Sequence, residues 1–204
     1  MTLRKVRGLL SVLLIWRNLP AFIMFGFSDR QKIKEDLGRE IQYMPFNNPG
    51  LLALNYALLF IKPFRSVFRY RTVQQKPWLV LFSWLVPRSL PGIEIDGQIE
   101  GGVLLYHKLG CVLSPYKAGR NLTVSQGVTV GKGNRSENGF NAPVIGDNVQ
   151  LCTNAVVFGG INIGNNVIVG AGTVLNKSVP DNCTVVGNPV HIVRKNGEKC
   201  FEEL

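Results

Sequence analysis

The chain has few of the residues that build metal sites and disulfide frameworks. Two of its 204 residues are histidines, His107 and His191, and four are cysteines. The cysteines stand at positions 111, 152, 183 and 200, without a Cys-x-x-Cys pair. Zinc sites and disulfide scaffolds are usually recognised in a sequence by closely or regularly spaced cysteines. The sequence therefore predicts reduced thiols, a reducing cytoplasm and no metal site.

A long unbroken apolar run is also missing. The apolar stretch from Leu9 to Phe27 is interrupted by Arg17, Asn18 and Pro20. A spanning helix needs about twenty consecutive apolar residues. A secretory signal would show a small-x-small cleavage site after its first apolar block, and none follows here. Two interpretations stay open: an interfacial or re-entrant segment at a membrane, and a helix packed in an oligomer interface.

Net charge is absent from the C-terminal part. Residues 93–204 carry nine Lys and Arg against nine Asp and Glu, whereas residues 1–92 carry 14 against 4. A segment that is both basic and apolar favours an anionic membrane surface. No motif that reads a nucleic-acid groove is present. We therefore expect membrane-surface contact through residues 1–91 and no nucleic-acid partner.

Helical signals fill the N-terminal part. Ser28 is a candidate cap for a helix over residues 29–43. A second helix is expected over residues 51–71, kinked or broken by Pro63. A short apolar piece covers residues 78–86 and ends before a proline.

A period of six residues organises the chain from Ile145 to Pro180. The first residue of each six is aliphatic: Ile145, Leu151, Val157, Ile163, Val169 and Leu175. The fifth is apolar or small: Val149, Ala155, Ile161, Val167, Thr173 and Val179. Side chains alternate along a strand, so these positions share one face if each six forms a strand and a corner. Gly and Asn between them permit the positive φ values of tight corners.

Such a repeat predicts a solenoid in which three strands and three corners close a coil of about eighteen residues. A meander of short antiparallel strands is the alternative. The repeat also runs through AGRNLT, VSQGVT and VGKGNR from Ala118, after a slip of about one residue. Val130 and Ile145 are separated by 15 residues where six are expected. The extra residues must leave the coil as a loop, where function is often placed.

Three regions follow from these patterns. Residues 1–91 form a basic, apolar, α-helical region for oligomerisation, membrane association or both. Residues 92–187 form the repeat, with an out-looped segment at 131–144. Residues 188–204 form a tail interpreted as basic.

Several motifs resemble those of known proteins. IGNNVIVGAGTVL and SVPDNCTVVGNPVHIV resemble the hexapeptide-repeat acyltransferases. GIEIDGQIEGGVLLYHKLGCVL resembles the region of serine acetyltransferases that carries their catalytic histidine. The resemblance covers about residues 92–196. It implies a mainly β fold, a left-handed parallel β-helix preceded by helices, and assembly as a homotrimer or a dimer of trimers. The spacing alone does not set the handedness.

The resemblance implies acetyl-CoA-dependent transfer of an acetyl group to a hydroxyl. Such a reaction needs a base with a pKa near neutrality beside the acceptor, and histidine is the usual choice. The family's base matches His107, and its carboxylate partner matches Glu94 across a two-residue gap. A carboxylate there would orient the imidazole.

Coenzyme contacts are implied in the same way. The positions matching the family's pantetheine groove are Gly131, Thr153, Gly170 and Ala171. The candidate partners of the adenosine phosphates are Lys177, Arg194 and Lys195, since cationic side chains bind phosphate.

The chain departs from serine acetyltransferases at the acceptor site. Tyr106 stands where they have Asp before the base, and Asn141-Ala142 stands where they have Arg-His before Pro143. An Asn-Ala pair offers no charge for the carboxylate of serine. Similar departures occur in acetyltransferases of exopolysaccharide synthesis, such as those for colanic acid, whose acceptor is a sugar, often on a lipid carrier. The acceptor therefore stays open between L-serine and a sugar hydroxyl, with Tyr106, Asn141 and Ala142 as its candidate contacts.

Other classes remain as alternatives. A non-catalytic scaffold or membrane-docking protein would use the same solenoid. A zinc hydratase like the γ-class carbonic anhydrases needs three histidines, and the repeat contains only His107. We expect an enzyme of the cytoplasm, or one bound peripherally to the inner face of the membrane.

Overall fold

The computed structural model describes residues 2–74, 76–107, 110–136 and 139–204. The chain divides into two compact units, Met1–Pro91 and Gly92–Leu204. We call the first the helical unit and the second the β-helix unit, and each is described by itself.

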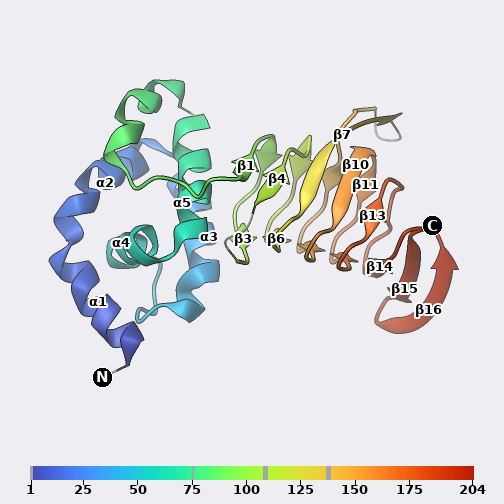
Figure 1. The fold of residues 1–204 in the computed structure, drawn as a ribbon, viewed down its shortest axis with the longest axis horizontal. Helices are drawn as coiled ribbons and strands as arrows, with labels where there is room; N and C mark the ends of the chain where they lie inside the picture. Colours follow the sequence, from blue (N-terminus) through green and yellow to red (C-terminus); the bar gives the residue numbers. More distant parts are fainter. Residues whose placement is uncertain (1, 75, 108–109, 137–138) are drawn as a thin grey trace. The chain divides into compact units, whose positions relative to one another are not determined.

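Short helices make up the helical unit (Figure 1). The α-helices are α1 (Leu3–Leu13), α2 (Leu19–Phe27), α3 (Arg30–Glu40), α4 (Leu51–Phe60) and α5 (Lys62–Arg69). The 3-10 segments are η1 (Ile15–Asn18), η2 (Ile41–Tyr43) and η4 (Pro77–Leu85), and η3 (Tyr70–Gln74) is a π-helix.

The cap of α3 differs from the sequence prediction. Asp29, not Ser28, occupies the N-cap, and its side chain accepts from the backbone N–H of Lys32 at 3.2 Å. The hydroxyl of Ser28 instead donates to the carbonyl of Met24 at 2.7 Å and so ends α2. Ser28 thus satisfies a carbonyl at the end of α2, and Asp29 satisfies an N–H at the start of α3.

The break expected at Pro63 is confirmed. Helix α4 ends at Phe60, α5 begins at Lys62, and Ile61 between them is extended with φ −107° and ψ 87°. Proline fits the first turn of a helix, because its missing N–H is unpaired there in any case. It therefore starts α5 without distorting it.

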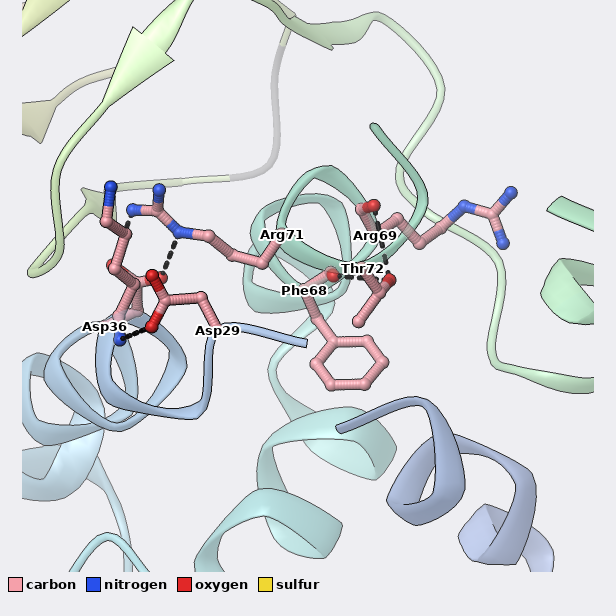
Figure 2. A network of polar contacts seen from close by, with 7 residues as sticks. Asp29, Asp36, Phe68, Arg69, Arg71 and Thr72 are labelled. Carbon is pink, nitrogen blue, oxygen red and sulfur yellow. Dashed lines mark hydrogen bonds and ion pairs between the residues drawn. The ribbon is translucent and has the colours of Figure 1, made fainter. Parts of the chain in front are cut away.

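A buried ion pair ties α3 to η3. Nε of Arg71 lies 2.8 Å from Oδ2 of Asp36, and Nη2 lies 3.2 Å from Oδ1. Arg71 is 0% exposed and Asp36 1%. Figure 2 shows this fork beside the hydroxyl of Thr72, which donates to the carbonyl of Phe68 at 2.8 Å. The same unit contains an apolar core cluster that includes Met24, Leu37 and Phe68.

Length and composition bear on membrane insertion. In the described residues, no single helix is long and apolar enough to cross a bilayer. Two bent pairs reach the required length and composition together: Leu3–Leu13 with Ile15–Phe27, and Leu51–Phe60 with Lys62–Val73.

The β-helix unit stacks short strands into three parallel sheets, each extended once per coil (Figure 1). The first sheet holds β1 (Ile93–Ile95), β4 (Cys111–Leu113), β7 (Thr129–Ser136), β10 (Val156–Gly160) and β13 (Val174–Leu175). The second holds β2 (Gln98–Ile99), β5 (Lys117–Ala118), β8 (Val144–Ile145) and β11 (Asn162–Ile163). The third holds β3 (Leu104–Leu105), β6 (Thr123–Val124), β9 (Gln150–Leu151), β12 (Ile168–Val169) and β14 (Cys183–Val186), followed by β15 (His191–Lys195) and β16 (Glu198–Glu203).

The repeat prediction is confirmed at the level of single side chains. Every first and fifth residue of the six hexads from Ile145 is buried, with exposures of 0–3%. Corresponding strands of successive coils pair in parallel, as Val156 does with Val174. The meander of antiparallel strands is therefore excluded for the coils.

Asparagines build one corner of the coils. Asn121, Asn148, Asn166 and Asn182 have φ between 56° and 60°. Each donates from Nδ2 to the Oδ1 of the next, at 2.9, 3.1 and 2.9 Å in turn. Asparagine tolerates the left-handed conformation better than other residues with a Cβ. The ladder thus satisfies both the backbone and the side chain at each corner.

The irregularities of the repeat lie at the other corners. Val156 lies 18 residues before its partner Val174 but 27 after its partner Thr129, so nine residues are inserted between β7 and β8. Part of this predicted loop, residues 137–138, lies outside the described residues. Five residues separate Leu105 from Cys111, of which residues 108–109 lie outside the described residues, whereas only residues 125–127 separate Val124 from Val128.

The C-terminal tail is folded. Strands β15 and β16 form antiparallel pairs that continue the third sheet from β14. Residues 188–204 hold three basic and three acidic residues. The interpretation of this segment as a basic tail was therefore wrong, because its acidic residues cancel the charge.

Candidate active site

His107 lies on the corner that is two residues longer than the one after it. Its side chain is exposed, and its backbone has φ 71°. The left-handed region costs a residue with a Cβ about 1–2 kcal/mol. Strain of this kind persists where the surroundings impose it, often at functional sites. The adjacent Tyr106 is half-buried, and its ring centroid is 6.3 Å from that of His107.

Register places two candidate coenzyme residues on the same edge of the solenoid. Leu105, Val124, Leu151 and Val169 are paired in successive coils. His107, Thr153 and Ala171 each stand two residues after such a position, on the corners that lead back to the first sheet. We call this edge, formed by residues 106–107, 110, 125–127, 152–154 and 170–172, the His107 edge. Coils are spaced by about 4.8 Å, so the edge forms one continuous wall.

Glu94 is exposed on β1 of the first sheet, opposite Val112. No hydrogen bond between His107 and Glu94 is found among the described residues. The structure thus places Glu94 on the sheet beside the His107 edge without joining the two side chains. Its role as an orienting carboxylate stays a prediction.

The two candidate coenzyme glycines differ in their surroundings. A Cβ on Gly170 would lie 2.7 Å from Cγ1 of Val186 and 3.1 Å from the carbonyl oxygen of Val185. Gly170 is therefore required by packing between coils, whatever it binds. A Cβ on Gly131 would meet nothing within 4 Å. Open space beside Gly131 is what a groove for a coenzyme arm requires.

The opposite side of the first sheet ends in a second edge, which we call the loop edge, residues 114–116, 139–143 and 176–178. The ring of Phe140 stacks on Tyr116 with centroids 3.5 Å apart. The backbone N–H of Gly133 donates to the carbonyl of Asn141 at 2.8 Å. Asn141 is exposed, but Ala142 is only 4% exposed. The Ala142 side chain therefore offers little surface to an acceptor, and its role as a substrate contact stays a prediction.

Two of the three candidate phosphate partners, Lys177 and Lys195, already contact other groups of the chain. Nζ of Lys177, on the loop edge, contacts the backbone oxygen of Leu204. Nζ of Lys195 lies 3.0 Å from a carboxylate oxygen of Glu202, and this hydrogen bond raises the pKa of Lys195. Arg194 is exposed on β15. Lys177 and Lys195 would have to exchange these contacts for a phosphate.

The predicted site residues thus fall into separate groups. His107, Thr153, Gly170 and Ala171 lie on the His107 edge, and Asn141 and Lys177 on the loop edge. Gly131 lies on β7, which leads to the loop edge, and Arg194 and Lys195 on the hairpin. Pairing through the first sheet separates the two edges by the width of that sheet. One β-helix unit therefore does not gather all of these residues around a single point.

The described part of the chain contains neither a group of metal ligands nor a cysteine activated for thiol chemistry. No three of its His, Cys, Asp and Glu residues are grouped so as to hold a metal ion. All four cysteines are free. Burial raises the pKa of the Cys111 thiol, which keeps it protonated and unreactive.

Sequence reasoning missed two features of the site. The longer connection between Leu105 and Cys111 was hidden, because Ile99, Leu105 and Cys111 keep a spacing of six while the next connection is shorter. The stack of Tyr116 on Phe140 joins residues from different coils. The two exposed aromatic residues beside repeat breaks were the only available signal for it.

Three stacked sheets, buried first and fifth positions and a loop inserted between coils define a hexapeptide-repeat β-helix protein. Comparisons narrow this class. Serine acetyltransferases of Staphylococcus xylosus and Bacillus pumilus are 43% identical over 117 residues and 39% identical over 122. The matches cover 56% and 58% of this chain, and 54% and 56% of those proteins. The matched part thus spans about half the length of these relatives.

Solved structures give the same result. The serine acetyltransferase CysE of Neisseria gonorrhoeae superposes with a TM-score of 0.64 at 26% identity, covering 87% of this chain and 69% of that one. The soybean serine acetyltransferase apoenzyme gives 0.57 at 29% identity, covering 80% and 68%. No family model matches the sequence. In its repeat sequence and in its fold, the chain is similar to the hexapeptide-repeat serine acetyltransferases.

Proposed function

We propose that the protein is an acetyl-CoA-dependent O-acetyltransferase in which His107 is the general base. The observation that carries this proposal is the placement of His107, strained and exposed, on one edge with Thr153 and Ala171. The relatives named serine acetyltransferases support the reaction class. A scaffold has no need of a strained histidine at the position where the family has its base.

The chemistry follows from the residue type. Neutral His107 takes the proton of the acceptor hydroxyl as its oxygen attacks the thioester carbonyl. When the tetrahedral intermediate collapses, the imidazolium returns the proton to the leaving thiolate of coenzyme A. One base thus serves both steps, and no net proton is lost.

His107→Asn tests this proposal. Asparagine tolerates the positive φ of this position but cannot act as a base at neutral pH. We expect acetyl transfer, followed by thiol release, to fall about 10²–10⁴-fold. His191→Ala is the control, because His191 lies on β15, where it stacks on Phe201. Full activity of His107→Asn, or no acetyl transfer by the unsubstituted protein with any acceptor, would leave the scaffold function as the better account.

Gly131 and Gly170 provide a matched test of coenzyme binding. Gly131→Ala should raise the KM for acetyl-CoA with an unchanged melting temperature, because its Cβ enters open space. Gly170→Ala should lower the melting temperature, because its Cβ meets Val186. An unchanged KM in Gly131→Ala would remove Gly131 from the coenzyme site.

The acceptor is a hydroxyl of a sugar or of L-serine, and the loop edge favours the sugar. Asn141 supplies no charge for a carboxylate, the Ala142 side chain is buried, and Tyr116 and Phe140 present a stacked aromatic surface. Sugar rings pack well on aromatic faces, which are large and apolar. Thiol release with L-serine should therefore be slower than with nucleotide sugars or lipid-linked sugars. Faster turnover of L-serine would assign the acceptor to serine.

The site is completed by a second copy of the chain, in a trimer or a dimer of trimers. The candidate residues lie on two edges of one solenoid, and stacking the His107 edge of one copy near the loop edge of another would bring them together. Light scattering should give a trimer or hexamer. A mixture of His107→Asn and Lys177→Gln chains should then recover part of the acetyl transfer that each variant lacks. A monomer that is fully active would contradict this arrangement.

Membrane contact through the helical unit completes the proposal, and it places the enzyme at the inner face of the membrane. Trp16, Leu81 and Trp84 are 64–78% exposed, and basic residues such as Arg4 and Arg7 are interspersed with apolar ones along α1. Apolar and cationic groups together bind anionic lipid surfaces. The protein should sediment with vesicles containing phosphatidylglycerol and less with pure phosphatidylcholine. Trp84→Ser should weaken this binding, and equal binding to both vesicles would exclude the charge contribution.

A further inference from the structure

The helical unit contains a polar cavity, which the acetyl-transfer chemistry does not use. Its volume is about 450 Å³. It is open to solvent on one side and is lined by η1, the C-terminal end of α4, helix α5 and the segment that follows η4. Arg17, Arg65 and Arg88 line it together with Asn18, and none of its described lining residues is acidic.

The three guanidinium groups concentrate positive charge on this cavity. Arg65 is held in place, because its Nε and Nη2 donate to the carbonyls of Leu58 and Leu59, each at 2.7 Å. Burial first, and then the charge of Arg17, lowers the pKa of Arg65. Within the described residues, none of the three arginines forms an ion pair with a carboxylate. Like charges brought together without a counter-ion favour an anionic ligand.

Asn18 adds a different requirement. It is 1% exposed, and its Nδ2 donates to Oδ1 of Asn55 at 2.7 Å. Asn55 in turn donates from Nδ2 to the carbonyl of Ser11, which fixes the orientation of both amides. Oδ1 of Asn18 is left buried, without a hydrogen-bond partner in the part of the chain described. A buried acceptor of this kind is costly unless a donor reaches it.

From this arrangement we infer that the cavity binds a phosphate ester that carries a free hydroxyl group. Arginine forks match the several oxygens of a phosphate, whereas the two oxygens of a carboxylate leave one of three guanidiniums without a partner. A hydroxyl on the same ligand supplies the donor that Oδ1 of Asn18 lacks. The inference is independent of the acetyl-transfer proposal.

Two sources offer this chemistry: a soluble polyol phosphate and the headgroup of a glycerophospholipid. Trp16 and Leu19, which flank this part of η1, are exposed, as is Trp84 near the C-terminal end of η4. The experiment therefore has a soluble arm and a vesicle arm, both with the full chain.

In the soluble arm, calorimetry measures binding of glycerol 3-phosphate, propyl phosphate and inorganic phosphate. Glycerol 3-phosphate should bind most tightly, because it alone provides both the ester phosphate and a hydroxyl. The double variant Arg17→Gln, Arg88→Gln should weaken it about tenfold to a hundredfold, since charge-assisted hydrogen bonds are lost. Both residues are exposed, so their replacement spares the fold, and the double variant Arg30→Gln, Lys34→Gln, at two exposed residues of α3, removes the same net charge and is the control. His107→Asn should bind as the unsubstituted protein does.

In the vesicle arm, phosphatidylcholine vesicles with and without phosphatidylglycerol are compared by sedimentation. Weaker binding of the Arg17→Gln, Arg88→Gln variant than of the Arg30→Gln, Lys34→Gln control would identify the lipid headgroup as the source. Equal vesicle binding, together with weaker binding of glycerol 3-phosphate, would identify a soluble ester. Equal behaviour of both variants in both arms would overturn the proposal. Equal affinity for propyl phosphate and glycerol 3-phosphate would overturn the role of Asn18.

Discussion

The described buried polar side chains of the β-helix unit are two threonines, Thr123 and Thr173, whereas the helical unit buries Arg71, Asp36 and Glu40 together with several amides and hydroxyls. The difference follows from how each unit satisfies its backbone. Successive coils of the β-helix pair through their backbone groups in all three sheets. Their core therefore needs few polar side chains and is filled by apolar ones of suitable size. The helices meet at irregular angles and leave gaps that longer polar side chains fill. Stability should therefore be spread evenly in one unit and concentrated in a few pairs in the other.

The largest effect is expected at the buried ion pair of the helical unit. Asp36→Ala leaves the guanidinium of Arg71 buried without its carboxylate and should cost about 3–5 kcal/mol of unfolding free energy. Chemical denaturation, followed by tryptophan fluorescence, measures this loss, because all three tryptophans lie in the helical unit. Replacing both partners, Asp36→Leu with Arg71→Met, should cost much less. A single variant as stable as the double variant would show that the pair is not decisive.

An interior substitution in the β-helix should cost somewhat less and should be independent of the coil. Leu151→Ala and Leu175→Ala each remove a side chain that is 0% exposed at the first position of its hexad. Each should destabilise by about 3 kcal/mol through lost burial and an unfilled cavity. Thermal denaturation followed by far-ultraviolet circular dichroism is the measurement. Costs that differ strongly between these two leucines would contradict an evenly distributed core.

Glu40 should make the helical unit dependent on pH. Burial raises the pKa of this carboxyl to about 7 from an ordinary value of 4.5. The folded state thus favours the protonated form, and its contribution is complete below pH 4.5 and lost as the pH rises through 7. Between pH 5.5 and 8 the loss should be about 2 kcal/mol. Glu40→Gln should remove this pH dependence and stabilise the protein at pH 8, whereas Glu35→Gln on the same helix should not.

The smallest effect is expected at the asparagine ladder. Asn166→Ala places a Cβ residue without an amide at φ 56° and removes two hydrogen bonds to Asn148 and Asn182. The cost should be about 1–2 kcal/mol. Asn166→Gly keeps the backbone relaxed and should recover part of it. Identical melting temperatures for the Ala and Gly variants would mean that the side-chain ladder, and not the backbone, sets the cost.

Much of the fold was readable because its determinants are local. Each hexad forms the same strand and corner, so the place of an apolar residue in its hexad predicts that it is buried. Pro63 separates α4 from α5 through the restriction that its own ring places on the backbone. The candidate site was readable only in part. His107 stood out because histidines are rare here, but the burial of Ala142 and the packing role of Gly170 depend on neighbouring coils. The contact between the rings of Tyr116 and Phe140 depends on them as well.

The sequence by itself determined the solenoid, the place where a loop must leave it, and the division between a basic helical part and a neutral repeat. Periodicity and composition are properties of residues that are close together in the chain, so they can be recognised in the sequence itself. Tertiary structure alone decided that Asp36 meets Arg71, that three arginines line one cavity with Asn18, and that the candidate site residues separate onto two edges. Those outcomes depend on contacts between residues far apart in the chain, and only packing selects among them.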